Sequence, residues 1–180
     1  MLIENVKKME FLVNMSKSEK RRKEAKKRQK ENNTPKWYYD ACVLEKRLIY
    51  PEITSIKNPK IPIISHLALG EAYGNCLLDK GEEKADNFLK FIKLLKQNNF
   101  LYIKGNDGID KIFNEINSSL DFRLSITDAV HLATAIKHEC CIFKTADAKD
   151  FKEINKNKIK ELGKKYNTPN FAISVIPLSS

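Results

Sequence analysis

Residues 125–151 read SITDAVHLATAIKHECCIFKTADAKDF, and this stretch decides the fold. Ser125 stands three residues before Asp128, which is the spacing of a capping box, so we expect a helix to begin here. The apolar run at 140–144 then predicts a strand. Asp147 follows closely. The stretch therefore predicts a helix, a strand and an acidic loop just past the carboxyl end of the strand.

The rest of the chain repeats this alternation. Periodic apolar positions predict further helices, and short apolar runs predict further strands. The helices are expected at 65–79, 82–97, 107–120 and 152–165, and the strands at 37–44, 100–103 and 171–176. Such alternation is typical of an α/β fold with a largely parallel sheet covered by helices on both faces. Ligands of these folds bind beyond the carboxyl ends of the strands.

Length and charge indicate one compact domain with a basic N-terminal extension. The chain has 180 residues, of which 42% are hydrophobic, and this suffices for a sizeable core. Residues 17–30 hold nine Lys or Arg and two Glu, so they carry +7 of the total charge of +10. We therefore expect a helical or flexible extension at 1–36 and the compact domain at 37–180.

The basic extension is a candidate contact for nucleic acid. Clustered cations attract phosphate backbones in a salt-sensitive way that does not depend on base sequence. A segment this charged is also commonly a solvated tail with no specific partner. The residues that would carry the contact are Lys20, Arg21, Arg22, Lys26, Lys27 and Arg28.

The sequence gives no sign of a membrane protein or of a zinc site. No stretch approaches the roughly 18 consecutive apolar residues of a membrane span, so we expect a cytoplasmic protein. The cysteines have neither paired CxxC spacing nor a neighbouring His arranged as for zinc. Reduced thiols are therefore expected at Cys42, Cys76, Cys140 and Cys141.

Asp40 and Glu71 are acids in apolar surroundings. Asp40 interrupts the predicted strand at 37–44, where burial of an unpaired carboxylate would be costly. The alternative is an edge strand on which Asp40 points to water. Glu71 follows Leu67 by four residues on an apolar helical stripe. It therefore faces inward or into a cleft, unless its carboxylate reaches solvent at the boundary.

Asp128 and Asp147 lie near the ends of predicted elements. Asp128 precedes the apolar positions of its helix at helical spacing, so it belongs to the buried face. An Asp in a first turn can equally stabilise a helix by capping, with no further role. Asp147 lies in a loop, where Asp is common. Each acid taken alone has an ordinary structural explanation.

The four acids taken together indicate a metal site. Acids from two strand ends and two helices can converge at the carboxyl edge of one sheet. Their mutual repulsion is tolerable only if a cation neutralises it, and carboxylate oxygens select Mg²⁺ or Mn²⁺ over zinc. Such a site activates water and stabilises charge on a phosphoryl group. The set therefore predicts hydrolysis of phosphodiester bonds.

Four stretches resemble the PIN domain, the nuclease fold of the VapC toxins and of many archaeal relatives. The resemblance covers residues 37 to about 178 and rests on 39–44, 65–75, 127–135 and 144–151. It implies a three-layer α/β/α sandwich, Mg²⁺ or Mn²⁺ as cofactor, RNA substrates and frequent homodimers. It matches Asp40, Glu71, Asp128 and Asp147 to the acidic positions of the family, and Thr145 to a hydroxyl that supports the last acid. A toxin would also imply a cognate antitoxin as partner.

Two features distinguish the chain from the common toxin pattern. The basic extension is not part of the usual compact domain, so membership of the toxins does not follow from the fold. Asp150 could share metal binding with Asp147, although its pairing with Phe151 suggests that it closes a loop.

Two histidines lie near the acids in the sequence. His131 follows Asp128 by three residues on a helix packed by Leu132, so we expect a hydrogen-bonded core histidine. His66 and Glu71 are five residues apart, which points them about 140° away from each other around a helix. We assign neither histidine a catalytic role.

The sequence thus predicts a metal-dependent endoribonuclease, with the toxin of a toxin–antitoxin pair as one form of it. Two rival hypotheses remain. One is a catalytically silent PIN-like module that binds RNA or a ribonucleoprotein. The other is a metal-dependent DNA nuclease.

Overall fold

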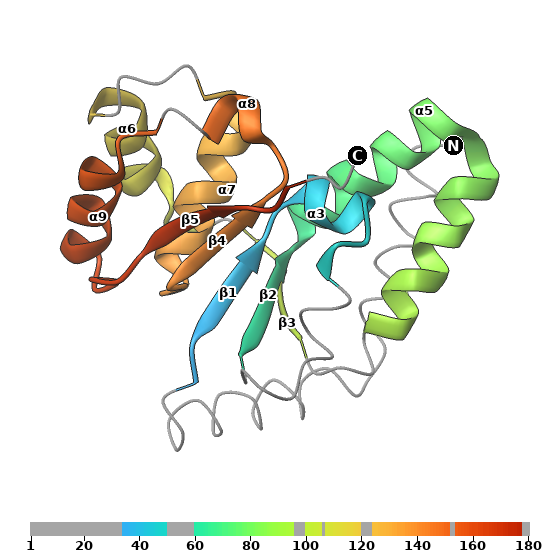
Figure 1. The fold of residues 1–180 in the computed structure, drawn as a ribbon, viewed down its shortest axis with the longest axis horizontal. Coiled ribbons are helices and arrows are strands. Elements are labelled where there is room, and N and C mark those ends of the chain that lie inside the picture. The colour runs from blue at the N-terminus through green and yellow to red at the C-terminus, as the bar shows by residue number, and fades with distance from the viewer. Residues whose placement is uncertain are drawn as a thin grey trace.

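A computed structural model describes residues 34–49, 60–95, 100–105, 107–119, 124–151 and 154–177. Within these ranges the chain forms a five-stranded sheet flanked by helices (Figure 1). Residues 1–33 of the predicted basic extension, with its six candidate nucleic-acid contacts, lie outside the described residues. The boundary between extension and domain therefore stays a prediction.

All neighbouring strands of the sheet run parallel. β1 (Lys36–Tyr39) lies at the centre of the order β3-β2-β1-β4-β5. β1 pairs with β2 (Ile61–Ser65) on one side and with β4 (Ile142–Thr145) on the other. β3 (Leu101–Ile103) and β5 (Ala172–Val175) form the edges. The predicted parallel sheet is confirmed, and the carboxyl ends of β1 and β4 lie side by side.

Helices cover both faces of the sheet. The pleat sends successive side chains of β1 to opposite faces, so Tyr39 packs in one core and Tyr38 in the other. α3 (Ala41–Glu45) and α5 (His66–Leu95) contribute to the first core. The second core receives α6 (Asp110–Ser119), α7 (Ile126–Lys137) and α9 (Lys156–Lys165). Figure 1 shows the resulting layers, which confirm the α/β/α sandwich.

The strand predicted at 37–44 is shorter than expected. β1 ends at Tyr39, and α3 begins two residues later. Asp40 is the N-cap of α3, since its backbone is extended and its carboxylate accepts the N–H of Ala41. The prediction was wrong because a short apolar run suits a buried helix as well as a strand, and the capping Asp decides between them.

Two of the predicted helices meet at a kink, and a third begins later than expected. α5 spans residues 66–95 but has a non-helical backbone at Gly81, so the two helices expected on either side of this residue are confirmed. Gly81 has a φ of 79°, a left-handed conformation that favours glycine. The helix predicted at 152–165 corresponds to α9, which begins only at Lys156, and a separate short helix, α8 (Ala148–Phe151), precedes the predicted range. The side chain of Asn155 caps α9 and so marks its start.

The structure also describes the state of the cysteines and the character of the helices. All four cysteines carry free thiols, of which two are buried and two half-buried. None of the described helices combines the length and the apolar character that a membrane crossing requires.

Candidate active site

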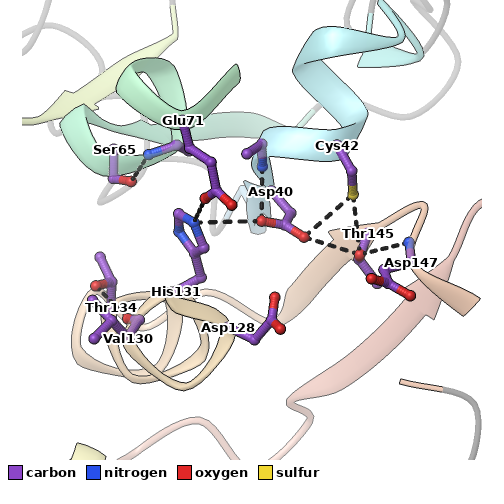
Figure 2. A network of polar contacts seen from close by, with 12 residues as sticks. Asp40, Cys42, Ser65, Glu71, Asp128, Val130, His131, Thr134, Thr145 and Asp147 are labelled. Atoms are coloured by element: carbon purple, nitrogen blue, oxygen red, sulfur yellow. Dashed lines mark hydrogen bonds and ion pairs between the residues drawn. The ribbon is translucent and has the colours of Figure 1, made fainter. Parts of the chain in front are cut away.

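The four predicted acids come from four elements around the carboxyl ends of β1 and β4. Asp40 follows β1 and Asp147 follows β4. Glu71 lies in the second turn of α5, and Asp128 lies in the first turn of α7. Figure 2 shows their side chains in one region, with Thr145 between Asp40 and Asp147. The parallel topology thus brings together acids that are far apart in the sequence.

Asp40 is a buried carboxylate just past the end of the central strand of the sheet. Its exposed fraction is 4%, and its oxygens accept three hydrogen bonds. Oδ1 accepts the N–H of Ala41 at 2.7 Å, while Oδ2 accepts the hydroxyl of Thr145 at 3.0 Å and the thiol of Cys42 at 3.3 Å. The alternative of an edge-strand Asp that points to water is therefore wrong, because β1 is paired on both sides.

Glu71 is joined to Asp40 through His131. His131 Nε2 lies 2.8 Å from Glu71 Oε2 and 3.6 Å from Asp40 Oδ1 (Figure 2). The Glu71 side chain is 36% exposed, whereas that of His131 is 1% exposed. Glu71 therefore has one edge in the protein and the other open to solvent, which agrees with the inward or cleft-facing position expected for it.

His131 is the hydrogen-bonded core histidine that the sequence predicted, but its partners were not foreseen. Both of its ring nitrogens are engaged, with Tyr38 on one side and Glu71 on the other. The sequence offered one signal that His131 lies near the acids. His131 follows Asp128 by three residues, and this spacing places both side chains on one face of α7. Burial raises the pKa of Tyr38 well above its usual value, so this hydroxyl stays protonated.

Asp128 combines a capping role with a place among the acids. Its N–H donates to Ser125 Oγ at 3.1 Å, and Ser125 Oγ donates to Asp128 Oδ2 at 2.6 Å, so the expected cap is present. Desolvation by burial raises the pKa of Asp128, and the nearby charges of Asp40 and Asp150 raise it further. The cap does not exclude a further role, because the same carboxylate is close enough to two other acids to be repelled by them.

Thr145 connects Asp40 to the backbone of Asp147. Its buried hydroxyl donates to Asp40 and accepts the N–H of Asp147, both at 3.0 Å. Asp147 Oδ1 in turn accepts the N–H groups of Lys149 at 2.9 Å and Asp150 at 3.1 Å. Asp147 therefore caps the short helix α8, and Asp150 contributes a backbone donor to this loop.

Cys42 is a further side chain at this site that the sequence did not single out. Its Sγ contacts Asp40 and Thr145 and accepts the N–H of Ala146 at 3.0 Å. Burial and then the charge of Asp40 raise the pKa of this thiol to about 11. The thiol is therefore protonated at neutral pH, which disfavours the thiolate ligand that a soft metal would need.

The donor chemistry of the site suits a hard divalent cation. The candidate ligands are carboxylate oxygens, and the pKa of Asp128 is raised first by burial and then by the charges of Asp40 and Asp150, which a bound cation would offset. In the ranges that the structure describes, no three His, Cys, Asp or Glu side chains are grouped as they would be around a metal ion. Binding would therefore need bridging water or a change of side-chain rotamer.

Comparison with known proteins places the chain beside one family. The model of the family described as PIN domain matches residues 49–157, a range that includes Glu71, Asp128 and Asp147 and begins after Asp40. No curated protein sequence matches the chain.

Two solved structures resemble the fold. The structure of VapBC2 from Rickettsia felis, bound to a DNA fragment from the promoter, has a TM-score of 0.54 at 14% identity. That match covers 78% of this chain and 98% of the other. VapC20 of Mycobacterium tuberculosis, described as a toxin that cleaves the sarcin-ricin loop, has a TM-score of 0.48 at 13% identity, with 63% and 91% covered.

Proposed function

The chain belongs to the PIN domain family, and from this premise we propose that it is a metal-dependent endoribonuclease. The observation that carries the proposal is the buried carboxylate of Asp40, directly after the central strand, which is linked through His131 to Glu71 on α5. Burying a carboxylate and placing others beside it costs stability. A catalytic role for the acids accounts for that cost.

The proposed cofactor is Mg²⁺ or Mn²⁺, held by Asp40, Glu71, Asp128 and Asp147, directly or through bound water. Such a cation, when bound, lowers the pKa of an attacking water and stabilises negative charge on the phosphate. Asp40 is fixed for this role by three donors, and Thr145 positions Asp40 and the Asp147 backbone together. No side-chain nucleophile is required, which agrees with the protonated state of Cys42.

The acids oppose the rival hypothesis of a silent RNA-binding module. A pure RNA binder gains nothing from carboxylates gathered where a phosphate backbone would lie, because like charges repel. Basic side chains around the site and in the extension would hold the RNA backbone in the nuclease. The same acids would also serve a DNA nuclease, so the nature of the substrate is left to the experiment.

The proposal extends to partners and location. The solved structure of VapBC2 contains both VapB and VapC, as its name states. We propose that this chain likewise has a cognate antitoxin, forms a homodimer and acts in the cytoplasm. An antitoxin would inhibit cleavage by covering the acids, so partner-free protein is required for any assay.

The test is cleavage of a mixed pool of labelled single-stranded RNA and DNA oligonucleotides by the full chain, with Mg²⁺, Mn²⁺ or EDTA. Asp128→Asn is the inactive variant, and Asp110→Asn is its matched control. Both residues are acids in the first turn of a helix, but Asp110 lies on α6. We expect RNA cleavage that is lost with EDTA and in Asp128→Asn, and kept in Asp110→Asn.

Three results would contradict the proposal in different ways. RNA that is bound but not cut by folded, partner-free protein would favour the binding module. Cleavage confined to DNA would make the chain a DNA nuclease. Cleavage that persists with EDTA and in Asp128→Asn would mean that neither the acids nor a metal ion takes part in the mechanism.

A further inference from the structure

A buried chain of hydrogen bonds leads from the start of α5 to the acid Glu71. The N–H of Ala68 donates to Ser65 Oγ at 3.1 Å, and Ser65 Oγ lies 2.6 Å from the hydroxyl of Tyr38. That hydroxyl lies 2.7 Å from His131 Nδ1, and His131 Nε2 lies 2.8 Å from Glu71 Oε2. Tyr38, Ser65 and His131 are all at most 1% exposed, so water does not compete for these bonds.

The chemistry of its two ends gives this chain a direction. The N–H of Ala68 can only donate, and the carboxylate of Glu71 can only accept. When His131 is neutral, one arrangement satisfies every link: Ser65 donates to Tyr38, Tyr38 donates to His131 Nδ1, and His131 Nε2–H donates to Glu71. The opposite tautomer would turn the lone pair of Nε2 toward Glu71 and toward Asp40, which is 3.6 Å away.

We infer that Tyr38, Ser65 and His131 form a positioning relay, which holds the Nε2–H tautomer of His131 and thereby orients the carboxylates of Glu71 and Asp40. The expected effect of the relay on catalysis rests on the proposed function, whereas the hydrogen bonds of the relay do not. None of the three relay residues is itself a candidate metal ligand. Hydrogen bonds that orient the ligands of a metal commonly change its affinity 10- to 100-fold.

Tyr38→Phe breaks the relay at one atom. The ring of Tyr38 is stacked on Phe143 with their centroids 5.5 Å apart, and a phenylalanine keeps that contact. The variant removes only the hydroxyl that links Ser65 to His131. Tyr166→Phe is the matched control, because it also removes one tyrosine hydroxyl bonded to a side chain, that of Glu115, away from the acids.

The first readout is the tautomer of His131 in the metal-free full chain. Two-bond ¹H–¹⁵N correlation spectra at neutral pH distinguish a protonated Nε2 from a protonated Nδ1. We expect the Nε2–H form in the wild-type protein and in Tyr166→Phe. In Tyr38→Phe we expect both tautomers, because Nδ1 loses its donor. A purely structural role for Tyr38 would leave the tautomer unchanged.

The second readout is the affinity for Mn²⁺, measured by electron paramagnetic resonance. Tyr38→Phe should bind Mn²⁺ about 10-fold more weakly and lower kcat by a similar factor, with KM for RNA unchanged. Tyr166→Phe should match the wild-type protein. If Tyr38→Phe does not fold, Ser65→Ala removes the preceding donor and should shift both readouts in the same direction.

The outcomes separate the relay from the proposed function. The relay is overturned if His131 of the wild-type protein is protonated on Nδ1 only, or on both Nδ1 and Nε2. It is also overturned if the variants leave both the tautomer and the Mn²⁺ affinity unchanged. If the tautomer and the Mn²⁺ affinity shift as expected while the wild-type protein cleaves no nucleic acid, the relay stands and the proposed function fails.

Discussion

Two halves of the site are held in place by different kinds of contact. The inner half comprises Asp40, Glu71 and His131, and the outer half comprises Asp128 and Asp147. The inner half includes hydrogen bonds that span the chain: 60 residues separate Glu71 from His131, and 105 separate Asp40 from Thr145. Outer-half bonds are local, because Asp128 pairs with a residue three positions away and Asp147 with residues two and three positions on.

This difference shows where each half obtains its geometry. The inner half requires the sheet, α5 and α7 to be assembled, because its bonds cross between them. The outer half requires only the ends of two helices, where a carboxylate caps exposed N–H groups. Thr145 joins the halves, since its hydroxyl contacts Asp40 and the backbone of Asp147. Substitutions should therefore affect activity and stability in different proportions in the two halves.

Asp40→Asn should have the largest effect on activity. Outer-shell partners of a metal contribute 10- to 100-fold, so loss of a proposed ligand should lower kcat about 100-fold or more. The NH₂ group of the asparagine would also face one of the donors whose hydrogen bond Asp40 now accepts. The free energy of unfolding should therefore fall too. Cleavage assays and thermal unfolding measure the two effects. Full activity of the variant would show that Asp40 has no role in catalysis.

Asp128→Asn should be as inactive as Asp40→Asn but should not be destabilised without metal. The pKa of Asp128 is raised by burial and by neighbouring acids, so its charged form is disfavoured in the folded protein. Its neutral isostere relieves that repulsion and can still accept from Ser125. Thermal unfolding at neutral pH with EDTA should give an equal or higher Tm. A clear loss of Tm would contradict the distinction between the halves.

Thr145→Val should weaken both halves at once. It keeps the shape of the buried side chain but removes the hydroxyl shared by Asp40 and Asp147. We expect kcat to fall about 10- to 100-fold and the free energy of unfolding to fall by about 1–3 kcal/mol. Thr145→Ser keeps the hydroxyl and should recover most of the activity. If Val and Ser variants are equally active, Thr145 does not join the halves.

Ser125→Ala should affect stability more than chemistry. It removes the cap of α7, which typically contributes about 1 kcal/mol, and frees the carboxylate of Asp128. Since Asp128 itself is kept, kcat should fall less than in Thr145→Val. Denaturant unfolding and cleavage assays on the same preparation give both values. A loss of activity as large as that of Thr145→Val would show that the outer half is not built locally.

Glu115→Gln should have the smallest effect. It serves as the reference for substitutions in both halves, because it removes a charge away from the site. Hydrogen bonding from Lys165 lowers the pKa of Glu115, with a further contribution from Tyr166. A lowered pKa stabilises the fold above the unfolded-state value, and this contribution is lost as pH falls through the folded-state pKa. The variant should therefore lose less than about 1 kcal/mol at neutral pH, and the difference from wild type should vanish in acid. If the stability difference from wild type persists in acid, it arises from packing and not from the charge of Glu115.

Much of the fold could be predicted from the sequence because its signals are local. The apolar periods placed the helices, and Ser125 marked the start of α7. The alternation of elements gave the parallel sheet and its covered faces. Local signals also explain the errors, since the apolar run at 37–44 contains the end of a strand and the start of a helix, and its hydrophobicity does not mark Asp40 as the boundary between them.

The site was predictable as a list of acids but not as a set of contacts. Each acid could be singled out by its position on an element. The contacts of the inner half depend on which elements become neighbours, so His131 was expected in the core without Glu71 as its partner. Tyr38 gave no sign of its link to Ser65, because residues 27 positions apart meet only through the pairing of β1 with β2.

Titration of the full chain with Mn²⁺ tests the claim that both halves form one divalent-cation site. Wild type, Asp40→Asn, Asp128→Asn and the control Asp110→Asn should be compared by isothermal titration calorimetry. We expect saturable binding in wild type and Asp110→Asn, and affinity weaker by about 10-fold or more in each of the other two. Absence of binding by the wild-type protein, or wild-type affinity in either site variant, would contradict the claim.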